Sequence, residues 1–457
     1  MKGIHLALTV LMLLGTLALA AAQYKDPEET SKDAVVKRDE TAAPEQRYAD
    51  MPVVAVPYRR FTKPYYDWYT RKDTIDYHGA ADLRPDGDPS RLSEIAIGFL
   101  GPIENNPESI FGLPELHGAQ LAIEEANARG GYHGRPYVLK IHNESALWGA
   151  SSTELVKMLF NENCWAMAGC VDGQNCHIAL RVTLKLEMPI VDVGTTDRTV
   201  TETRIPWLLH NFPDDRQQGY TLADYVFKNL KLKRIGVLRT QTRYARIGVG
   251  EFNDEARRMG RQPVLEVKFE RGDKDFASQL RMLRDAKVEG VVLWGEAAEA
   301  GLILKQMRGM RMTQPVFGSS RIAYSQVLEI AGPAAEGLVV TAGLNPMRTD
   351  TKWVAFRDAY CHKFQEEPID YAAYAYDGMN ILFAAIEKAG LNRGRIMDAL
   401  RDYQMKTYQG VTGTDYFDHT LNNIAPVNMA RVKNGKFDYW LAPRQAGHEG
   451  VAHSGGQ

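Results

Sequence analysis

The sequence predicts an α/β fold with two doubly wound parallel-sheet lobes joined by a multi-strand hinge. Three observations support this prediction. From Glu94 onward, short apolar strands alternate with helices, and strands separated by helices pair in parallel with right-handed crossovers. The alternation pauses near His210 and then restarts, and two late helices have no strand between them. Two such lobes joined by more than one segment form a clamp that holds a ligand between them.

The first lobe is expected to span residues 92–212 plus 342–411. Its first strand is the apolar run IAIGFL, which ends at Gly101-Pro102, and its first helix ends at Gly130-Gly131 because glycine accepts the left-handed conformation there. The predicted elements are strand Ile95–Leu100, helix Glu115–Ala128, strand Tyr137–Ile141, helix Ser152–Phe160, strand Ala166–Ala168, helix Ala179–Leu186 and strand Pro189–Val193.

The second lobe is expected to span residues 213–341 plus 412–441. The chain crosses into it at His210–Asp215 and leaves it near Val339–Gly343. Its predicted elements are helix Tyr220–Leu230, strand Arg234–Leu238, helix Gly248–Met259, strand Val264–Phe269, helix Phe276–Ala286, strand Gly290–Leu293, helix Ala298–Met307 and strand Pro315–Phe317. Helices at Lys352–Gln365 and Tyr371–Ala389 then return to cover the first lobe.

Both ends of the chain differ from these lobes. Residues 1–22 fit a secretory signal peptide, with Lys2, an apolar run and then small alanines; cleavage after Ala20 or Ala22 fits equally well, and an uncleaved anchor is the alternative. No cysteine follows the run, so we expect a periplasmic protein without a lipid anchor. Residues 23–91 form an irregular extension, either a strap or a docking segment, and residues 442–457 a disordered tail.

Composition and cysteine spacing exclude several classes of partner. The net charge of the 457 residues is -2, and basic residues are not clustered, so we expect no nucleic-acid partner. We also expect a monomer. Cys164, Cys170 and Cys176 do not have the spacing of common zinc ligands. Together with Cys361 they are predicted to be buried thiols or to include one disulfide, and no metal or cofactor is expected.

Enzyme motifs are absent from the sequence. There is no GxSxG elbow, phosphate loop, HExxH or GxGxxG after the first strand. His142, His177 and His210 are isolated, and Asp214-Asp215 is predicted to be a helix N-cap and hinge device. We therefore expect a binding protein rather than an enzyme.

Ligands of open parallel sheets lie beyond the carboxyl ends of the strands. Gly173 and Gly194 would let backbone amides approach a ligand, and Thr195 or Thr196 would add a hydroxyl. These residues form a cradle for a carboxylate or another polar group. The loops at this edge are Asn105–Phe111, Asp172–Asn175, Gly194–Asp197, Thr242–Tyr244, Glu296 and Ser319–Arg321.

Seven stretches resemble the type I periplasmic binding proteins, in the branched-chain amino-acid-binding (leucine/isoleucine/valine) subgroup, between Glu94 and Trp440. The resemblance implies the type I periplasmic binding protein fold, with three crossings and a hinge that closes over the ligand. It also implies an ABC permease as the membrane partner. The stretches, in family order, are IAIGFLGPI, HGAQLAIEEANARGG, PIVDVGTT, KRIGVLR, GDKDFASQLRML, AAEGLVVTAG and YAAYAYDGMNILFAAIEKAG.

The same resemblance implies a set of binding residues. The family's Ser or Thr that holds the α-carboxylate falls at Gly173, with Gln174 beside it; the Thr of the next loop is retained as Thr196, after the small residue Gly194. A second-lobe aromatic is retained as Tyr244.

The chain departs from the family where an acid would pair with the ligand's ammonium group. That acid falls near Ser320, and a second aromatic falls near Ala297. A buried ammonium without a carboxylate is costly. Either Glu296 takes its place, or Arg243 or Arg321 faces the cleft and the ligand is an organic anion without an amine.

We therefore predict the extracytoplasmic substrate-binding component of an ABC importer, which binds an amino acid or a related small polar solute by lobe closure. The alternative is a ligand-sensing module of the same fold that acts on a receptor or regulatory partner, with a non-amino-acid organic anion as ligand. The predicted ligand-binding residues are Phe111, Gly173, Gln174, Gly194, Thr195, Thr196, Tyr244, Glu296, Ser320 and Arg321.

Overall fold

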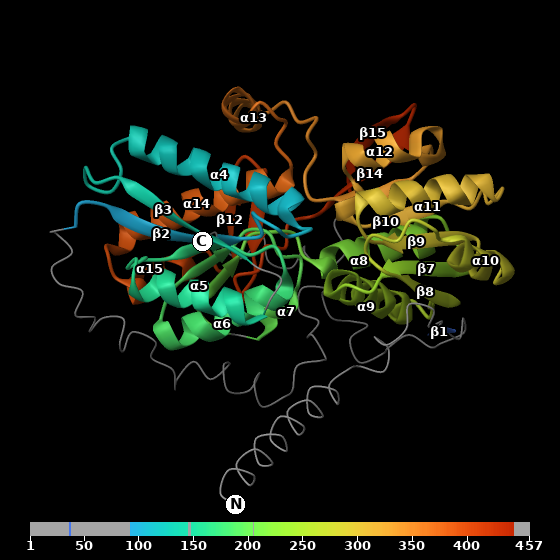
Figure 1. The fold of residues 1–457 in the computed structure, drawn as a ribbon, viewed down its shortest axis with the longest axis horizontal. Helices are drawn as coiled ribbons and strands as arrows, with labels where there is room; N and C mark the ends of the chain where they lie inside the picture. The colour runs from blue at the N-terminus through green and yellow to red at the C-terminus, as the bar shows by residue number, and fades with distance from the viewer. Residues whose placement is uncertain (1–35, 38–91, 145–147, 204, 443–457) are drawn as a thin grey trace, which may run out of the picture.

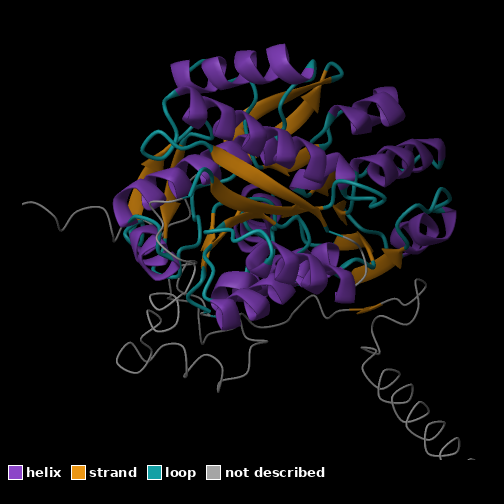
Figure 2. Ribbon diagram, turned by 60° about the vertical axis from the view of Figure 1, so that its left-hand side comes forward, coloured by secondary structure: helices purple, strands orange, loops and turns teal. Residues whose placement is uncertain are grey.

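The computed structural model describes residues 36–37, 92–144, 148–203 and 205–442, which fold into two lobes (Figure 1). Each lobe is a sheet with helices on both faces (Figure 2). The predicted signal peptide, nearly all of the 23–91 extension and residues 443–457 lie outside the described residues. None of the described helices is long and apolar enough to cross a membrane.

The first lobe contains a five-stranded parallel sheet. Every residue of its interior strand β2 is buried, as expected for a strand covered on both faces. The strand order is β3 (Tyr137–Asn143), β2 (Ile95–Gly101), β4 (Met167–Gly169), β5 (Ile190–Asp192) and β6 (Leu208–His210).

Helices α4 and α14 pack together on one face of this sheet, with α5 and α6 on the other (Figure 1). Gly118 permits the close approach of α4 to α14, because a Cβ at this position would lie 2.0 Å from the carbonyl oxygen of Ala372. The first-lobe helices are α4 (Ser109–Ala128), α5 (Trp148–Phe160), α6 (Gly173–Leu186), α7 (Thr199–Glu202), α13 (Thr351–Phe364), α14 (Asp370–Ala389) and α15 (Arg393–Arg401).

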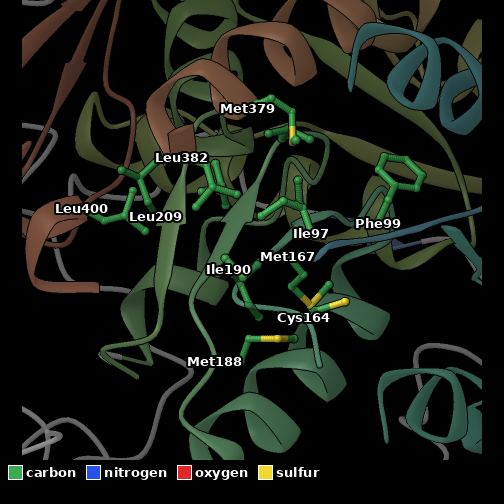
Figure 3. Close-up of a cluster of buried hydrophobic side chains, with 14 of the residues drawn as sticks. Ile97, Phe99, Cys164, Met167, Met188, Ile190, Leu209, Met379, Leu382 and Leu400 are labelled. Atoms are coloured by element: carbon green, nitrogen blue, oxygen red, sulfur yellow. The ribbon is translucent and has the colours of Figure 1, made fainter. Parts of the chain in front are cut away.

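The core of the first lobe forms between the strands and α14 (Figure 3). Ile97 and Leu209 of the strands lie toward Met379 and Leu382 of α14, whereas Ile190 points to the other face of the sheet near Met188; all of these side chains are buried. Burying an aliphatic side chain of this size stabilises the fold by about 1.5–3 kcal/mol. The sheet therefore holds the loops at its carboxyl edge in fixed positions.

The second lobe contains an eight-stranded mixed sheet. Strands β8, β7, β9, β10 and β11 are parallel, and β1, β14 and β15 are antiparallel to their neighbours. The order is β1 (Val36–Lys37), β8 (Leu265–Phe269), β7 (Ile235–Thr240), β9 (Gly290–Trp294), β10 (Val316–Gly318), β11 (Val339–Ala342), β14 (Asn428–Lys433) and β15 (Lys436–Leu441).

Helices also cover both faces of the second sheet (Figure 1). Helices α8 and α9 share one hydrophobic cluster with the sheet, and α10, α11 and α12 share another. The bounds are α8 (Asp215–Ala223), which continues as a π-helix at Asp224–Asn229, α9 (Arg243–Arg258), α10 (Ala277–Asp285), α11 (Ala297–Gly309) and α12 (Ser325–Ala331).

Three segments cross between the lobes, after β6, after β11 and before β14. His210 ties two of them together, since its Nδ1 lies 2.6 Å from Asn422 Oδ1 and its Nε2 lies 2.7 Å from the Thr195 carbonyl oxygen. The third crossing follows the hairpin β12 (Lys406–Gln409) and β13 (Thr414–Phe417). Phe417 lies in the first-lobe core, so the change of lobe comes after this hairpin rather than at residue 412.

The predicted strands match those observed to within two residues, but four helices begin five or six residues earlier than predicted. Phe111, Gly173, Gln174 and Tyr244 therefore lie in the first turns of α4, α6 and α9, and their assignment to loops is wrong. The first turn of α6 is polar and that of α9 carries two arginines, so the apolar period does not extend into them, and in α4 the predicted start directly follows Pro114. The sequence also missed β6, α7, α12, α15 and strands β12–β15.

All four cysteines are free thiols. Cys164, Cys170 and Cys176 are buried, which agrees with the prediction of buried thiols. Burial raises the pKa of the Cys164 thiol to about 12, so this thiol stays protonated at neutral pH.

Candidate ligand-binding site

A pocket lies between the two lobes and opens to solvent. Its first-lobe wall comes from the loops after β4 and β5 and the start of α6, and its second-lobe wall from the start of α9. The lining residues are Val171, Asp172, Gly173, Thr195, Thr196, Asp197, Asp215, Arg243, Tyr244, Ile247 and Arg321.

Helix α6 points its N-terminus at this pocket. The Asp172 side chain caps it by accepting hydrogen bonds from the backbone amides of Gln174 (2.8 Å) and Asn175 (3.1 Å). Gly173 follows, and a Cβ there would lie 2.5 Å from Asp197 Oδ2. Only glycine at this position lets the Asp197 carboxylate approach the helix so closely.

Asp197 forms an ion pair across the two lobes. Arg243 of α9 donates to its Oδ2 through Nε at 2.8 Å, and the Arg243 terminal nitrogen lies 2.7 Å from the same oxygen. Burial opposes ionisation of Asp197, but the Arg243 guanidinium outweighs burial and holds the pKa of Asp197 below its usual value. The Arg243 guanidinium of the second lobe is therefore paired with a first-lobe carboxylate.

Asp215 is a pocket residue that the sequence prediction assigned to hinge capping. Asp214 alone caps α8, in a capping box with Gln217. The neighbouring Asp215 side chain is fully buried; its Oδ2 accepts from Thr196 Oγ1 at 3.1 Å, and its Oδ1 has no hydrogen-bond partner among the described residues. Burial, reinforced by the charge of Asp197, raises the pKa of Asp215 well above its usual value.

Arg321 brings its guanidinium from the second lobe into the centre of the contact. Its NH1 donates to Glu108 (3.1 Å) and Glu296 (3.3 Å). Its Nε donates to Tyr371 Oη at 3.2 Å, and its NH2 donates to the Val171 carbonyl oxygen at 3.4 Å. Glu108, Tyr371 and Val171 belong to the first lobe, so one side chain holds both lobes.

We use the term interlobe latch for Glu108, Glu296, Arg271 and Arg321. Arg271 NH2 lies 2.9 Å from both Glu108 Oε1 and Glu296 Oε1. Although burial opposes it, the charges of Arg321 and Arg271 hold the pKa of Glu108 below its usual value. Glu108 and Glu296 stand at the N-cap positions of α4 and α11, yet in the described structure neither caps its helix. Their carboxylates serve the latch instead.

Five of the ten predicted ligand-binding residues line the pocket: Gly173, Thr195, Thr196, Tyr244 and Arg321. The structure places the other five outside its lining. Phe111 packs on Arg321, and Glu296 belongs to the latch. Gln174 is exposed, and Gly194 and Ser320 are buried behind the lining.

Asp172, Asp197 and Asp215 complete the pocket but were not among the predicted binding residues. Asp172 and Asp197 lie in loops that the sequence analysis selected, but other residues of these loops, mainly glycines and threonines, were predicted to bind the ligand. Asp215 had a usable signal, because a helix that begins where the chain enters the second lobe starts at the cleft. The predicted role as helix N-cap is filled by Asp214 and not by Asp215.

Comparisons with known proteins agree with this architecture. A sequence profile of periplasmic binding proteins matches residues 94–436. Leu/Ile/Val-binding protein homolog 2 of Brucella abortus is 26% identical over 356 residues, which cover 76% of this chain and 94% of the relative. The leucine-, isoleucine-, valine-, threonine-, and alanine-binding protein of Pseudomonas aeruginosa is 24% identical, with coverage of 70% and 86% respectively.

Solved structures give the same result. A leucine-binding protein of Thermotoga maritima superposes with a TM-score of 0.68 at 25% identity and covers 76% of this chain and 97% of its own. The branched-chain amino acid transporter substrate-binding protein of Streptococcus pneumoniae, solved in complex with isoleucine, has a TM-score of 0.68 at 26% identity, with coverage of 76% and 99%. The predicted two-lobed type I fold is confirmed.

Proposed function

The chain belongs to the periplasmic binding protein family, and from this premise we propose that it is the substrate-binding component of an ABC importer for an amino acid. The family consists of solute-binding proteins, so the chain is not an enzyme. The relatives named above bind amino acids, and the solved relative from Streptococcus pneumoniae serves a transporter. These names favour transport over the sensory alternative.

The observation that carries the proposal is the Asp215 carboxylate. It is fully buried in the pocket lining, and its Oδ1 has no partner among the described residues. A buried carboxylate oxygen without a donor is costly. The ammonium group of an amino acid supplies that donor and a compensating charge, with Thr196 Oγ1 beside it. Asp215 thus takes the role that the sequence analysis gave to Glu296.

The carboxylate of the same ligand would bind at the start of α6. Gly173 is the first residue of this helix and lines the pocket. The first amides of a helix attract anions, but Asp172 already accepts from those of Gln174 and Asn175, so the ligand carboxylate would bind at the Gly173 amide. This amide and the Asp215 carboxylate together match an α-amino acid better than an amine-free anion.

The ligand would act by favouring the closed arrangement of the lobes. Thr196 and Gly173 belong to the first lobe and Tyr244 to the second, so a ligand in the pocket contacts both. A ligand shifts such an equilibrium only by its differential affinity for the closed state. We propose that the chain is exported to the periplasm, acts as a monomer and presents this closed state to the permease.

A thermal-shift screen of the mature chain tests the proposal. A ligand that binds only the folded state raises the free energy of unfolding by mass action, by about 2.7 kcal/mol at a concentration of 100 Kd, and so raises the melting temperature. We expect α-amino acids to raise it and the matching amine-free acids, such as propionate beside alanine, to have no effect. A rise with the acids alone would refute the role of Asp215 and favour an organic anion.

A further inference from the structure

We propose that Arg321 fills the part of the pocket that would receive an apolar side chain, so that this protein selects small α-amino acids over branched-chain ones. The inference rests on the proposed function and adds the substrate class. It identifies Arg321 as the residue that determines specificity, through the volume it occupies.

An aromatic cluster lies directly behind Arg321. We define it as Phe111, Phe212, Tyr371 and Tyr374, together with Val171, which pack as one buried group. The rings of Phe111 and Tyr371 are stacked 4.8 Å apart, and Phe212 lies 4.6 Å from Tyr371. Such a group of buried rings is a suitable environment for a leucine or phenylalanine side chain.

Val171 of this cluster lines the pocket, and Arg321 lies between the pocket and the aromatic rings of the cluster. Its guanidinium carbon lies 4.3 Å from the ring centre of Tyr244, which lines the pocket, and 4.7 Å from the ring centre of Phe111, which is not among the described lining residues. The arginine itself is 2% exposed and lines the pocket. A ligand side chain that reached toward Phe111 would have to occupy the same space.

The guanidinium is held in place by other protein groups. Its three nitrogens donate to Glu108, Glu296, Tyr371 Oη and the Val171 carbonyl oxygen. Its contacts with Glu296 and Tyr244 lie within the second lobe, whereas those with Glu108, Tyr371 and Val171 form only when the lobes meet. Removing the arginine from its position would leave two buried carboxylates short of one partner, which a single apolar ligand side chain cannot compensate.

The test uses calorimetric titration of the mature full chain with glycine, alanine, 2-aminobutyrate, norvaline, leucine, phenylalanine, aspartate and glutamate. We expect wild type to bind alanine at least tenfold more tightly than leucine. Arg321→Ala joins the pocket to the aromatic cluster and should reverse this preference by at least tenfold, since one methylene group in an apolar pocket changes affinity by about 10- to 200-fold.

Two matched variants separate volume from charge. Arg321→Met keeps a long side chain without the charge and should retain the preference for alanine. Arg271→Ala removes a charge from the same two carboxylates but leaves the pocket lining unchanged, so it should weaken all ligands alike. The melting temperature of each variant verifies that it is folded, and the wild-type series decides the question if Arg321→Ala does not fold.

The outcomes distinguish this inference from the function on which it rests. Wild-type affinity that rises from alanine to leucine would overturn the inference and leave amino-acid binding intact. A preference for aspartate or glutamate would also overturn it, because Arg321 would then contact the ligand by charge. No binding of any amino acid by wild type and Arg321→Ala would overturn the proposed function itself.

Discussion

Replacing Asp215 with asparagine should lower ligand affinity and raise the stability of the unliganded protein. The two effects have opposite signs because the buried carboxylate destabilises the unliganded protein but strengthens the binding of an ammonium group. Its side chain is fully buried, and its Oδ1 has no donor in the described part of the chain. The asparagine side chain would be similar in shape to the native one but carry no charge.

The size of each effect follows from burial. Removing one partner of a buried ion pair costs about 3–5 kcal/mol, and 1.4 kcal/mol is tenfold in affinity. Because the pKa of Asp215 is raised, ionising its carboxyl when the ligand binds costs part of this energy. We therefore expect a loss of ligand affinity at the lower end of the range, about 10²-fold. Relief of the unpaired carboxylate should stabilise the unliganded protein by about 1–3 kcal/mol at neutral pH.

The stability gain should depend on pH with a defined sign. The folded-state pKa of Asp215 lies above the unfolded value of 3.8, so the folded protein binds this proton more tightly. Wild-type stability from this group is therefore greatest below the unfolded pKa and falls as the pH rises. The advantage of Asp215→Asn should vanish in acid and grow toward neutral pH.

Calorimetry with alanine and thermal denaturation from pH 4 to pH 8 measure both effects. Asp285→Asn is the matched control, since Asp285 is 73% exposed and makes only a surface pair with Arg284. It should change neither affinity nor stability by more than about 0.5 kcal/mol. Unchanged ligand affinity in Asp215→Asn, whatever its stability, would refute the assignment of the ammonium site.

Three further predictions concern the latch, the core and the α6 turn. Glu108→Gln should weaken the interlobe latch by up to about 3 kcal/mol and enlarge the radius of gyration of the unliganded protein in X-ray scattering; an unchanged radius would count against the latch. Glu115 is buried, its carboxyl oxygens have no partner in the described structure, and burial followed by the charges of Glu144 and Asp192 raises its pKa. Glu115→Gln should therefore raise stability by about 1–3 kcal/mol at pH 7 and by nothing below pH 4, as followed by thermal denaturation. Gly173→Ala should place a Cβ 2.5 Å from Asp197 Oδ2 and weaken ligand binding about 5- to 150-fold, as measured by calorimetry.

The sequence predicted the strands well because buried parallel strands are short apolar runs, and it predicted both crossings that follow such runs. It failed at the helix starts. The first turns of α6 and α8 are polar and that of α9 carries two arginines, so they do not show the period of a packed helix; in α4 the predicted start follows Pro114, which is unfavourable inside a helix. Local rules thus fail where residues are selected for binding rather than for packing.

The site was predictable as a set of loops but not as a set of contacts. Gly173 and Thr196 were identified because their residue types suit a cradle, and both line the pocket. Arg321 was also chosen, but its contact with Glu108, 213 positions away in the chain, appears only when the lobes are brought together. Charge pairing between distant segments has no signature in spacing along the chain.

The latch and Asp215 act on lobe closure in opposite directions. Arg321 and Arg271 favour closure without a ligand, because their bonds to Glu108 exist only when the lobes meet. Asp215 is fully buried at the lobe contact in this arrangement, and an unpaired carboxylate opposes that burial. An ammonium group removes that cost and leaves the favourable latch, so even a small ligand with few apolar contacts can shift the equilibrium by several kcal/mol. On this account Asp215→Asn should close without a ligand, and its unliganded radius of gyration should be smaller than that of wild type.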